Sequence, residues 1–302
     1  MEELRKGTVI SGFGGFYQVR LDMQHVVECK PRGRLKKNYE KIYPGDTVEI
    51  SLLEDGTGMI ESIGPRHTAL RRPNIVNFNR ILIVLAWQLP DYDLLLLDRM
   101  LVLANQAGVQ PIICFNKMDL LQPGQEKEFQ AIHACYSQAG YHLLPVSAEQ
   151  PETVKQLREK LRGGLSVLAG PSGVGKSSLI NVLLGREQVE TGAVSDRLRR
   201  GKHTTRYATI MPLGQQEEEG FIADTPGFFT LDFPNDFQAE TLPLHYPDFS
   251  LYPGCYFDSC LHKKEPGCQV KQAVEENKIN RQRHERYLRL LEELQSREVK
   301  YR

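Results

Sequence analysis

Two nucleotide-binding patterns occur in this chain in an unusual order. Residues 170–177, Gly-Pro-Ser-Gly-Val-Gly-Lys-Ser, fit the phosphate-binding pattern G-x-x-x-x-G-K-[ST]. Residues 116–119, Asn-Lys-Met-Asp, are typical of guanine recognition, yet they lie upstream of the phosphate pattern instead of downstream. The same sheet can be built in either order where the original termini lay close together and were joined. The order therefore indicates a circularly permuted nucleotide-binding domain.

The phosphate pattern lies in the context that its chemistry needs. The apolar run 165–169 predicts a strand, and residues 178–184 predict a helix directly behind the loop. Glycines let successive backbone N–H groups point at one anion, Lys176 supplies charge to the phosphates, and Ser177 offers a hydroxyl to Mg²⁺. The predicted phosphate-binding residues are Gly170, Pro171, Ser172, Gly173, Val174, Gly175, Lys176, Ser177 and Ser178.

The guanine pattern follows another predicted strand, residues 109–115. Asp119 can accept hydrogen bonds from the N1–H and N2–H₂ edge of guanine, a donor pair that adenine lacks. Asn116 can bridge base and loop, and Lys117 can lay its aliphatic stem along the base. A further strand-like run ends before Ser147 and Ala148, where a backbone N–H could reach the guanine O6. The predicted base-binding residues are Asn116, Lys117, Met118, Asp119, Ser147 and Ala148.

Two segments beyond the phosphate loop have the form of nucleotide-sensing switches. Residues 220–227 predict a short strand that ends in Asp224, which would hold Mg²⁺ through water, followed by Gly227, which would sense the γ-phosphate. Residues 199–206 are basic and without periodicity, and a magnesium-binding threonine should fall there. Thr204 and Thr205 cannot be told apart by sequence, and we favour Thr205. The predicted magnesium ligands are thus Ser177, Thr205 and Asp224.

A cysteine cluster follows the switches. Cys255, Cys260, His262 and Cys268 fall within fourteen residues, whereas Cys29, Cys114 and Cys135 are scattered. Three thiolates and one imidazole predict a closed tetrahedral structural zinc site. Buried thiols clustered by chance are one alternative, and a disulfide is another, which the absence of a signal peptide disfavours. His245 and Asp258 are nearby alternatives to His262 as the fourth ligand.

The N-terminal 65 residues differ in pattern from the rest of the chain. They predict about five short strands of alternating apolar and polar residues, separated by glycine-containing turns. They predict a small barrel, either of the OB type that binds oligonucleotides or of an SH3-like type. Residues 30–37 carry five positive charges in eight residues, which could contact RNA phosphates, while Phe16 or Tyr39 could stack on bases. The alternative is a solvated basic loop.

Composition limits the remaining possibilities. The chain has 302 residues, of which 40% are hydrophobic and 25% charged, so two or three soluble domains are expected. The net charge is zero, which excludes a polycation. The longest apolar stretch, residues 94–104, is interrupted by Asp98 and Arg99 and is too short to span a bilayer, so it predicts a buried helix. Residues 278–294 predict a helix with a basic face and an apolar stripe, either for docking or as a solvated surface.

The combination of an N-terminal barrel, a permuted nucleotide-binding domain and a C-terminal Cys₃His cluster resembles the RsgA family of GTPases. The fold that we expect is therefore multidomain α/β: an OB-like β-barrel over 1–65, a circularly permuted GTPase sheet over 66–232, and a helical zinc-binding domain over 233–302. The resemblance implies a cytoplasmic, monomeric protein that binds the small ribosomal subunit and its rRNA late in maturation. It also implies GTP hydrolysis that the subunit stimulates, with GTP, Mg²⁺ and one structural Zn²⁺ bound.

The hydrolytic mechanism is less fixed by the sequence. Phe228 stands just after Gly227, where Ras-like enzymes place a water-orienting glutamine. We expect His203 to take this role, as the resemblance also implies, with Lys176 and Thr205 as the other catalytic residues; His203 contacting only RNA or solvent is the alternative. Two other functions stay open: a GTP-dependent switch acting on a non-ribosomal RNA or protein partner, and an RNA chaperone indifferent to the bound nucleotide.

Overall fold

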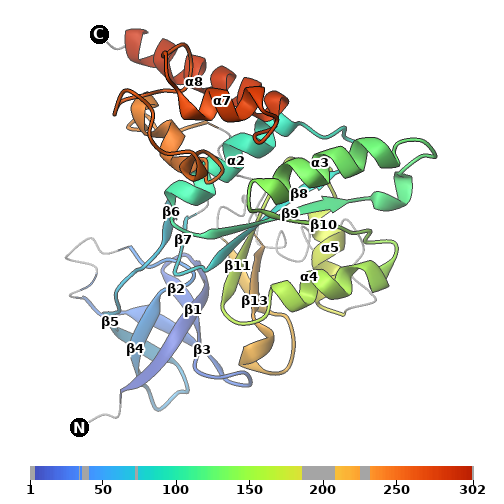
Figure 1. Cartoon of the computed structure of the whole chain (residues 1–302). Coiled ribbons are helices and arrows are strands. Elements are labelled where there is room, and N and C mark those ends of the chain that lie inside the picture. The colour runs from blue at the N-terminus through green and yellow to red at the C-terminus, as the bar shows by residue number, and fades with distance from the viewer. Residues whose placement is uncertain are drawn as a thin grey trace.

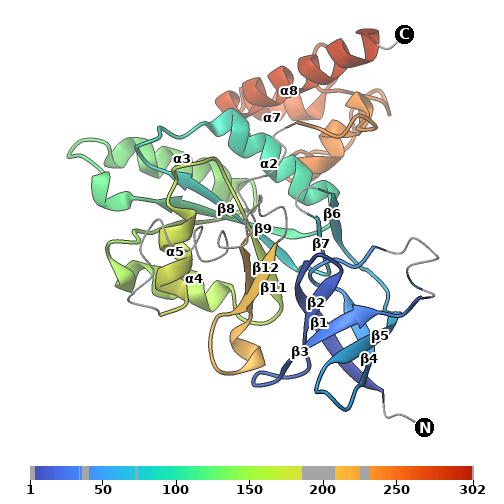
Figure 2. The same ribbon diagram turned by 180° about the vertical axis from the view of Figure 1, so that it is seen from behind.

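The computed structural model describes residues 4–33, 35, 41–71, 74–185, 208–224 and 232–300. Figure 1 shows three bodies along the chain: an N-terminal barrel in blue, a central sheet with helices in green and yellow, and a helical C-terminal body in orange and red. The barrel contacts one edge of the central sheet, whereas the C-terminal body packs against α2 (Leu94–Gln106), a helix that covers one face of the sheet (Figure 2).

The barrel is closed from five strands in the order β1-β2-β3-β5-β4, with β1 returning to β4. All neighbouring strands are antiparallel except β3 and β5, which pair in parallel with Cys29 opposite Gly58. Inward-facing apolar side chains such as Val9, Val19 and Ile50 fill its interior. The barrel expected from the sequence is confirmed, and its closed five-strand topology fits the OB type. The strands are β1 (Arg5–Phe13), β2 (Phe16–Arg20), β3 (Val26–Pro31), β4 (Thr47–Leu52) and β5 (Gly58–Ile63).

The central body is a six-stranded sheet in the order β10-β9-β8-β11-β13-β12. The strands are parallel except β12, which pairs antiparallel with β13. The chain runs outward from β8 to β9 and β10, then returns to place β11 on the other side of β8. A topological switch point therefore lies between β8 and β11, where open α/β sheets bind ligands. The strands are β8 (Arg80–Ala86), β9 (Gln110–Asn116), β10 (His142–Pro145), β11 (Leu165–Ala169), β12 (Thr209–Pro212) and β13 (Phe221–Asp224).

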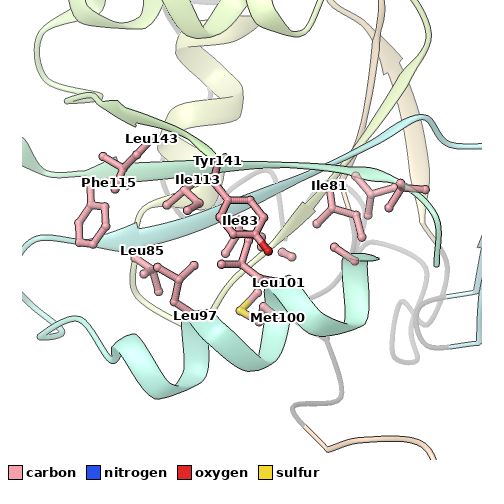
Figure 3. Packing of buried hydrophobic residues seen from close by; sticks show 14 of the residues in the cluster. Ile81, Ile83, Leu85, Leu97, Met100, Leu101, Ile113, Phe115, Tyr141 and Leu143 are labelled. Carbon is pink, nitrogen blue, oxygen red and sulfur yellow. The ribbon is translucent and has the colours of Figure 1, made fainter. Parts of the chain in front are cut away.

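Helices cover both faces of this sheet. Because its strands are buried on both sides, their sequences are nearly continuous apolar runs. One face packs against α2 (Leu94–Gln106) and α3 (Glu126–Gln138), and Figure 3 shows β8 residues Ile81, Ile83 and Leu85 meeting Leu97 and Leu101 of α2. The alternate β8 residues face α4 (Lys155–Lys160) and α5 (Lys176–Leu183). Short 3₁₀ turns lie at η1 (Met118–Leu120), η2 (Pro151–Val154) and η3 (Glu217–Glu219). The buried helix expected at residues 94–104 is confirmed as α2.

The C-terminal body has its own apolar cluster, which Val102 of α2 joins. It consists of η4 (Ala239–His245), η5 (Phe249–Leu251), α7 (Gln269–Glu275) and α8 (Arg281–Lys300). The expected apolar stripe of the last helix is buried, with Leu290, Leu291 and Leu294 almost inaccessible. Its basic face differs from expectation because Arg283 points inward and is 1% exposed.

The barrel is joined to the sheet by the hairpin of β6 (Ala69–Arg71) and β7 (Asn74–Val76). It also contacts the sheet edge directly, where β1 lies against β12 and the Arg20 guanidinium stacks on the Phe221 ring at 3.8 Å. None of the helices in the described part of the chain combines the length and the apolar character that a membrane span requires. The domain boundaries at 65 and 232 stay a prediction.

Candidate functional site

The phosphate loop turns directly from β11 into α5 at the switch point. Gly170 has φ +142°, and a Cβ there would come within 2.1 Å of the Val84 carbonyl oxygen on β8. Gly175 has φ +86°, and a Cβ there would come within 2.4 Å of the Asn116 amide nitrogen. Both positions therefore require glycine, since a side chain would meet a fixed neighbour. The remaining predicted residues, from Pro171 to Ser178, lie contiguously in this turn and the first residues of α5.

Lys176 and Asp224 carry the opposite charges of the site. The Lys176 ammonium donates hydrogen bonds to the carbonyls of Gly170 and Pro171, at 2.8 and 2.6 Å. Burial lowers the pKa of Lys176, and the nearby Asp224 partly offsets this. Burial likewise raises the pKa of Asp224, partly offset by Lys176. The site thus holds a carboxylate and an ammonium that are both partly stripped of water, a state typical of functional sites.

Asp224 ends β13, whose register with β11 sets Ala223 beside Val167. The pairing therefore places the Asp224 carboxylate near the carboxyl end of β11, where the phosphate loop begins at Gly170. Ser177, exposed at the start of α5, is the other predicted magnesium ligand that the structure describes. Oxygen donors of this kind suit Mg²⁺, which binds through one or two carboxylates together with substrate phosphates. Residues His203, Thr204, Thr205, Gly227 and Phe228 lie outside the described residues.

Asn116 connects the guanine pattern to the phosphate loop. It ends β9 and is 1% exposed. Its amide nitrogen donates to the Val174 carbonyl at 2.9 Å, and its side-chain oxygen accepts from the Ala148 N–H at 3.2 Å. One side chain therefore ties the phosphate loop, the guanine pattern and the Ser147–Ala148 turn into a single assembly. Without these partners a buried amide would be costly.

The other base-binding candidates surround Asn116. The Ser147 hydroxyl donates to the Asp119 carboxylate, which fixes the orientation of that carboxylate. Met118 donates its N–H to the Val146 carbonyl at 3.1 Å and packs against the sheet core. Lys117 has φ +61°, in the left-handed region. Its ammonium donates to the carbonyl of Leu89.

Both backbone N–H groups of the Ser147–Ala148 turn have protein partners. The Ala148 N–H is donated to Asn116 and the Ser147 N–H to the Thr153 hydroxyl at 2.8 Å, and the contact of this turn with the guanine O6 stays a prediction. The turn is therefore built by protein contacts within the site. Thr153 was missed by sequence reasoning, because a threonine six residues beyond the turn carries no pattern of its own.

The loop that follows β8 was also missed. Residues 87–93 lie at the carboxyl ends of the parallel strands, as the two motifs do. The Leu89 carbonyl accepts from Lys117 of the guanine motif, and the Pro90 ring lies beside Gly173 of the phosphate motif. The signal that could have found this loop is positional, since β8 lines the switch point where ligands bind.

The Cys₃His cluster forms a compact set of metal-ligand atoms. The ligand atoms of Cys255, Cys260, His262 and Cys268 all lie within 4.8 Å of one another. The two sulfurs of Cys255 and Cys268 are 3.9 Å apart, and His262 Nδ1 lies 3.7 and 3.3 Å from them. A tetrahedral site with zinc–sulfur bonds of about 2.3 Å separates its sulfurs by about 3.8 Å. The residues therefore fit a zinc ion, with His262 offering Nδ1.

The neighbours of this cluster hold it against α8. Tyr287 donates its hydroxyl to the Leu261 carbonyl at 2.6 Å, and His284 Nε2 lies 3.0 Å from the His262 carbonyl oxygen. The Phe249 ring packs edge-on against His262 at 5.4 Å between centroids. Such outer contacts orient metal ligands.

The basic segment of the barrel is described only in part. Arg32 forms an ion pair with the buried Glu61, which also accepts from the Ser51 hydroxyl at 2.9 Å. The Lys30 ammonium lies 4.6 Å from the centre of the Phe16 ring, which is 42% exposed. Arg34, Lys36, Lys37 and Tyr39 lie outside the described residues.

Known proteins resemble this chain over almost its whole length. The RsgA GTPase family model matches residues 63–234, and the RsgA N-terminal domain model matches residues 6–60. A small ribosomal subunit biogenesis GTPase RsgA from Clostridium botulinum is 38% identical over 98% of this chain and 99% of its own. The protein of the same name from Clostridium beijerinckii is 41% identical over 95% of this chain and 97% of its own.

Solved structures agree with these relatives. YjeQ from Thermotoga maritima superimposes with a TM-score of 0.84 at 31% identity, covering 97% of this chain and 99% of that one. YloQ, described as a circularly permuted GTPase, superimposes with a TM-score of 0.81 at 32% identity, covering 98% and 96%. The permuted order of motifs and the three-part fold are thereby confirmed. On its sequence, its sheet order and these matches, the chain belongs to the RsgA family of circularly permuted GTPases.

Proposed function

We propose that this protein is a magnesium-dependent GTPase that binds the small ribosomal subunit, assists its late maturation, and hydrolyses GTP to GDP and phosphate when the subunit stimulates it. Family membership and the names of the curated relatives support this role. The observation that carries the nucleotide part is Asn116, which joins the phosphate loop and the guanine pattern through two hydrogen bonds.

Each part of the nucleotide has candidate partners. Asp119 would accept from the guanine edge, while Lys117 would lie along the base. Backbone N–H groups of the phosphate loop and Lys176 would bind the phosphates. Ser177 and Asp224, with Thr205, would hold Mg²⁺, which neutralises charge on the transferring phosphoryl group. Positioning and charge supply nearly all the catalysis in such reactions, so we expect slow turnover by the protein alone.

The other two parts of the chain would serve binding and structure. The barrel, with Lys30 and Arg32 on its surface, would contact rRNA phosphates, a contact that weakens with salt. Cys255, Cys260, His262 and Cys268 would hold one structural zinc ion, and a closed set of four protein ligands supplies no open position for catalysis. We expect the protein to act as a monomer in the cytoplasm.

The test is the GTP hydrolysis rate of the purified protein with and without small ribosomal subunits. Large subunits and ATP serve as controls for the partner and the base. We expect strong stimulation that needs both GTP and the small subunit. Lys176→Ala should lower the stimulated rate by at least about a hundredfold, as loss of one essential charge donor does. Lys160→Ala, an exposed lysine at the end of α4, should leave it unchanged. Stimulation by large subunits alone would contradict the proposal.

The catalytic role of His203 is tested separately. In the proposal His203 orients the attacking water once the partner is bound, because Phe228 occupies the usual position of a water-orienting glutamine. His203→Ala should reduce stimulated turnover while subunit binding stays normal. Thr204→Ala and Thr205→Ala should separate the two candidate magnesium ligands, with only Thr205→Ala raising the Mg²⁺ concentration needed for turnover. Full stimulated turnover by His203→Ala with normal binding would exclude the role.

A further inference from the structure

The 87–93 loop contacts both halves of the nucleotide site. It begins at Trp87, whose N–H donates to the Asn116 carbonyl at 2.9 Å. The Leu89 carbonyl then accepts a hydrogen bond from the Lys117 ammonium. A Cβ placed on Gly173 of the phosphate loop would lie 3.6 Å from Pro90 Cδ. The loop therefore lies beside both the guanine pattern and the phosphate loop.

The position of the Lys117 ammonium depends on this loop. Lys117 and Leu89 both have left-handed backbones, with φ of +61° and +55°. Residues other than glycine hold this conformation only where their surroundings impose it. Leu89 is 71% exposed, so its own side chain packs little against the protein. Contacts elsewhere in the loop must therefore hold its carbonyl in place for the ammonium.

Gln125 supplies such a contact. Its side-chain oxygen accepts from Trp87 Nε1 at 3.1 Å and from Gln88 Nε2 at 3.3 Å. The same oxygen accepts from the Gln122 N–H at 3.0 Å, which fixes the turn before α3. One oxygen thus joins the first two residues of the 87–93 loop to the segment that follows the guanine pattern.

Aromatic packing holds the first residue of this loop, Trp87, in place. The Trp87 ring is 2% exposed and stacks on Tyr92 at 5.1 Å, with Phe129 of α3 edge-on at 5.8 Å. At its other end the loop passes into α2, where Asp93 caps the helix by accepting from the N–H groups of Leu95 and Leu96. The Leu89 carbonyl, which accepts the hydrogen bond from Lys117, lies between these two fixed ends of the loop.

We propose that Gln125 is a positioning residue for guanine-nucleotide binding, acting through residues 87–89 on Lys117; this rests on the proposed function. Its side-chain oxygen holds Trp87 and Gln88, these fix the Leu89 carbonyl, and that carbonyl directs the ammonium of Lys117. The stem of Lys117 is then held along the face of the guanine base. Gln125 lies beyond the guanine pattern and touches none of its residues through these bonds.

The test is the dissociation rate of a fluorescent GDP from the full-length protein in Mg²⁺. Gln125→Ala and the similarly sized Gln125→Met both remove the acceptor. Each should speed dissociation about threefold to tenfold, the effect of weakening a single hydrogen bond, here the one between the Leu89 carbonyl and Lys117. Gln125→Glu keeps an acceptor oxygen for all three donors and should release GDP at the wild-type rate. Gln122→Ala is the control, since the Gln122 side chain donates to the Leu120 carbonyl and to no other residue in the described part of the chain.

A double-variant comparison separates positioning from general loosening. In a Lys117→Ala background there is no ammonium to position, so adding Gln125→Ala should change dissociation by less than about twofold. Effects that multiply would overturn the proposal, as would a Gln125→Glu variant that behaves like Gln125→Ala. Dissociation from Gln125→Ala and Gln125→Met at the wild-type rate would overturn it as well.

The same experiment distinguishes this proposal from the proposed function. Wild-type protein that binds fluorescent GDP no better than fluorescent ADP would contradict the guanine site itself, and the role of Gln125 with it. Wild-type protein that prefers GDP, together with unchanged Gln125 variants, would remove only the positioning role. Thermal midpoints of all variants show whether each is folded, and Gln125→Met replaces Gln125→Ala if the smaller side chain destabilises the turn.

Discussion

The buried carboxylate of Asp98 accepts a hydrogen bond from the guanidinium of Arg283, which lies 185 residues further along the chain. Asp98 is on α2 of the nucleotide-binding body and Arg283 is on α8 of the C-terminal body, and both are almost inaccessible to solvent. Arg283 also donates to Asp248 at 3.0 Å, and Arg286 donates to the second oxygen of Asp98. The two bodies are thus joined by a buried network of two carboxylates and two guanidinium groups.

Removing one charge from this network should be strongly destabilising. Arg283→Met leaves Asp248 without the guanidinium that it contacts, and losing one partner of a buried ion pair costs about 3–5 kcal/mol. We expect a loss of this size in the free energy of unfolding, measured by urea denaturation. Trp87, the single tryptophan, reports on the central body, and limited proteolysis reports on the C-terminal body.

The control is Arg289→Met on the same helix. Arg289 is exposed, so its loss should change the free energy of unfolding by less than about 0.5 kcal/mol. Equal effects of the two substitutions would mean that the buried network does not hold the bodies together.

The zinc site predicts a selective effect of cysteine substitution. Cys260→Ser should lose the bound zinc and make the C-terminal body sensitive to protease, because metal binding is coupled to folding in small metal-containing domains. Nucleotide binding should persist, since the central sheet has its own apolar core. The measurement is zinc per chain by atomic emission, together with proteolysis and GDP affinity.

Cys135→Ser is the comparison for the zinc experiment. Cys135 is also a buried free thiol, but it lies on α3 and is not one of the four clustered residues. We expect one zinc per chain in the wild type and in Cys135→Ser. Full zinc content in Cys260→Ser would contradict the assignment of the ligands.

Features carried by short, local patterns could be predicted from the sequence. The phosphate loop needs consecutive residues between a strand and a helix, and the structure has that arrangement at β11 and α5. The same holds for the clustered cysteines, because their proximity in space follows from their proximity in the chain. The closed barrel was predictable because its alternating strands are separated by clear turn residues.

Contacts between distant residues could not be predicted in this way. Asp98 reads as an interruption of an apolar run, and only the fold shows that Arg283 neutralises it. Gln125 has no pattern, because its role depends on how β8 and β9 are placed side by side. His203, Thr205 and Gly227 lie outside the described residues, so their roles stay predictions.

Guanine specificity should depend on the carboxylate of Asp119. Asp119→Asn replaces one of the two carboxylate oxygens with an amide N–H₂, which opposes an N–H group of guanine and suits the carbonyl of xanthine. Loss of one hydrogen bond to a charged group, at about 1.5 kcal/mol or more, should weaken GDP binding at least about tenfold, whereas xanthosine diphosphate should bind more tightly than before. The measurement is competition of each nucleotide with fluorescent GDP.

Glu149→Gln provides the control for a local loss of charge. Glu149 is exposed one residue after Ala148, and its backbone N–H still bonds to the Ser147 hydroxyl. GDP affinity should be unchanged in this variant. If Glu149→Gln weakened GDP as much as Asp119→Asn, general electrostatics would explain the result better than recognition of the base.

The half-buried carboxylate of Asp224 should cost stability in the nucleotide-free protein. Burial raises its pKa above the ordinary value of 3.8, so the folded state binds more protons than the unfolded state between these two pKa values. Stability therefore falls as the pH rises through this window. Asp224→Asn should increase the free energy of unfolding at pH 8 by about 0.5–2 kcal/mol, the usual range where substitutions relieve a functional site. Magnesium-dependent GTP hydrolysis should fall sharply in the same variant.

Urea denaturation without nucleotide at pH 5 and pH 8 checks the sign. The gain from Asp224→Asn should be smaller at pH 5, because the wild-type carboxyl is closer to its neutral form there. Asp55→Asn should show the opposite sign, since the hydroxyl and N–H of Thr57 lower the pKa of Asp55 and its charged form therefore stabilises the fold at neutral pH. A variant at position 224 that is less stable than the wild type at pH 8 would show that Asp224 is satisfied by the fold, and its burial would then need no magnesium-binding role to explain it.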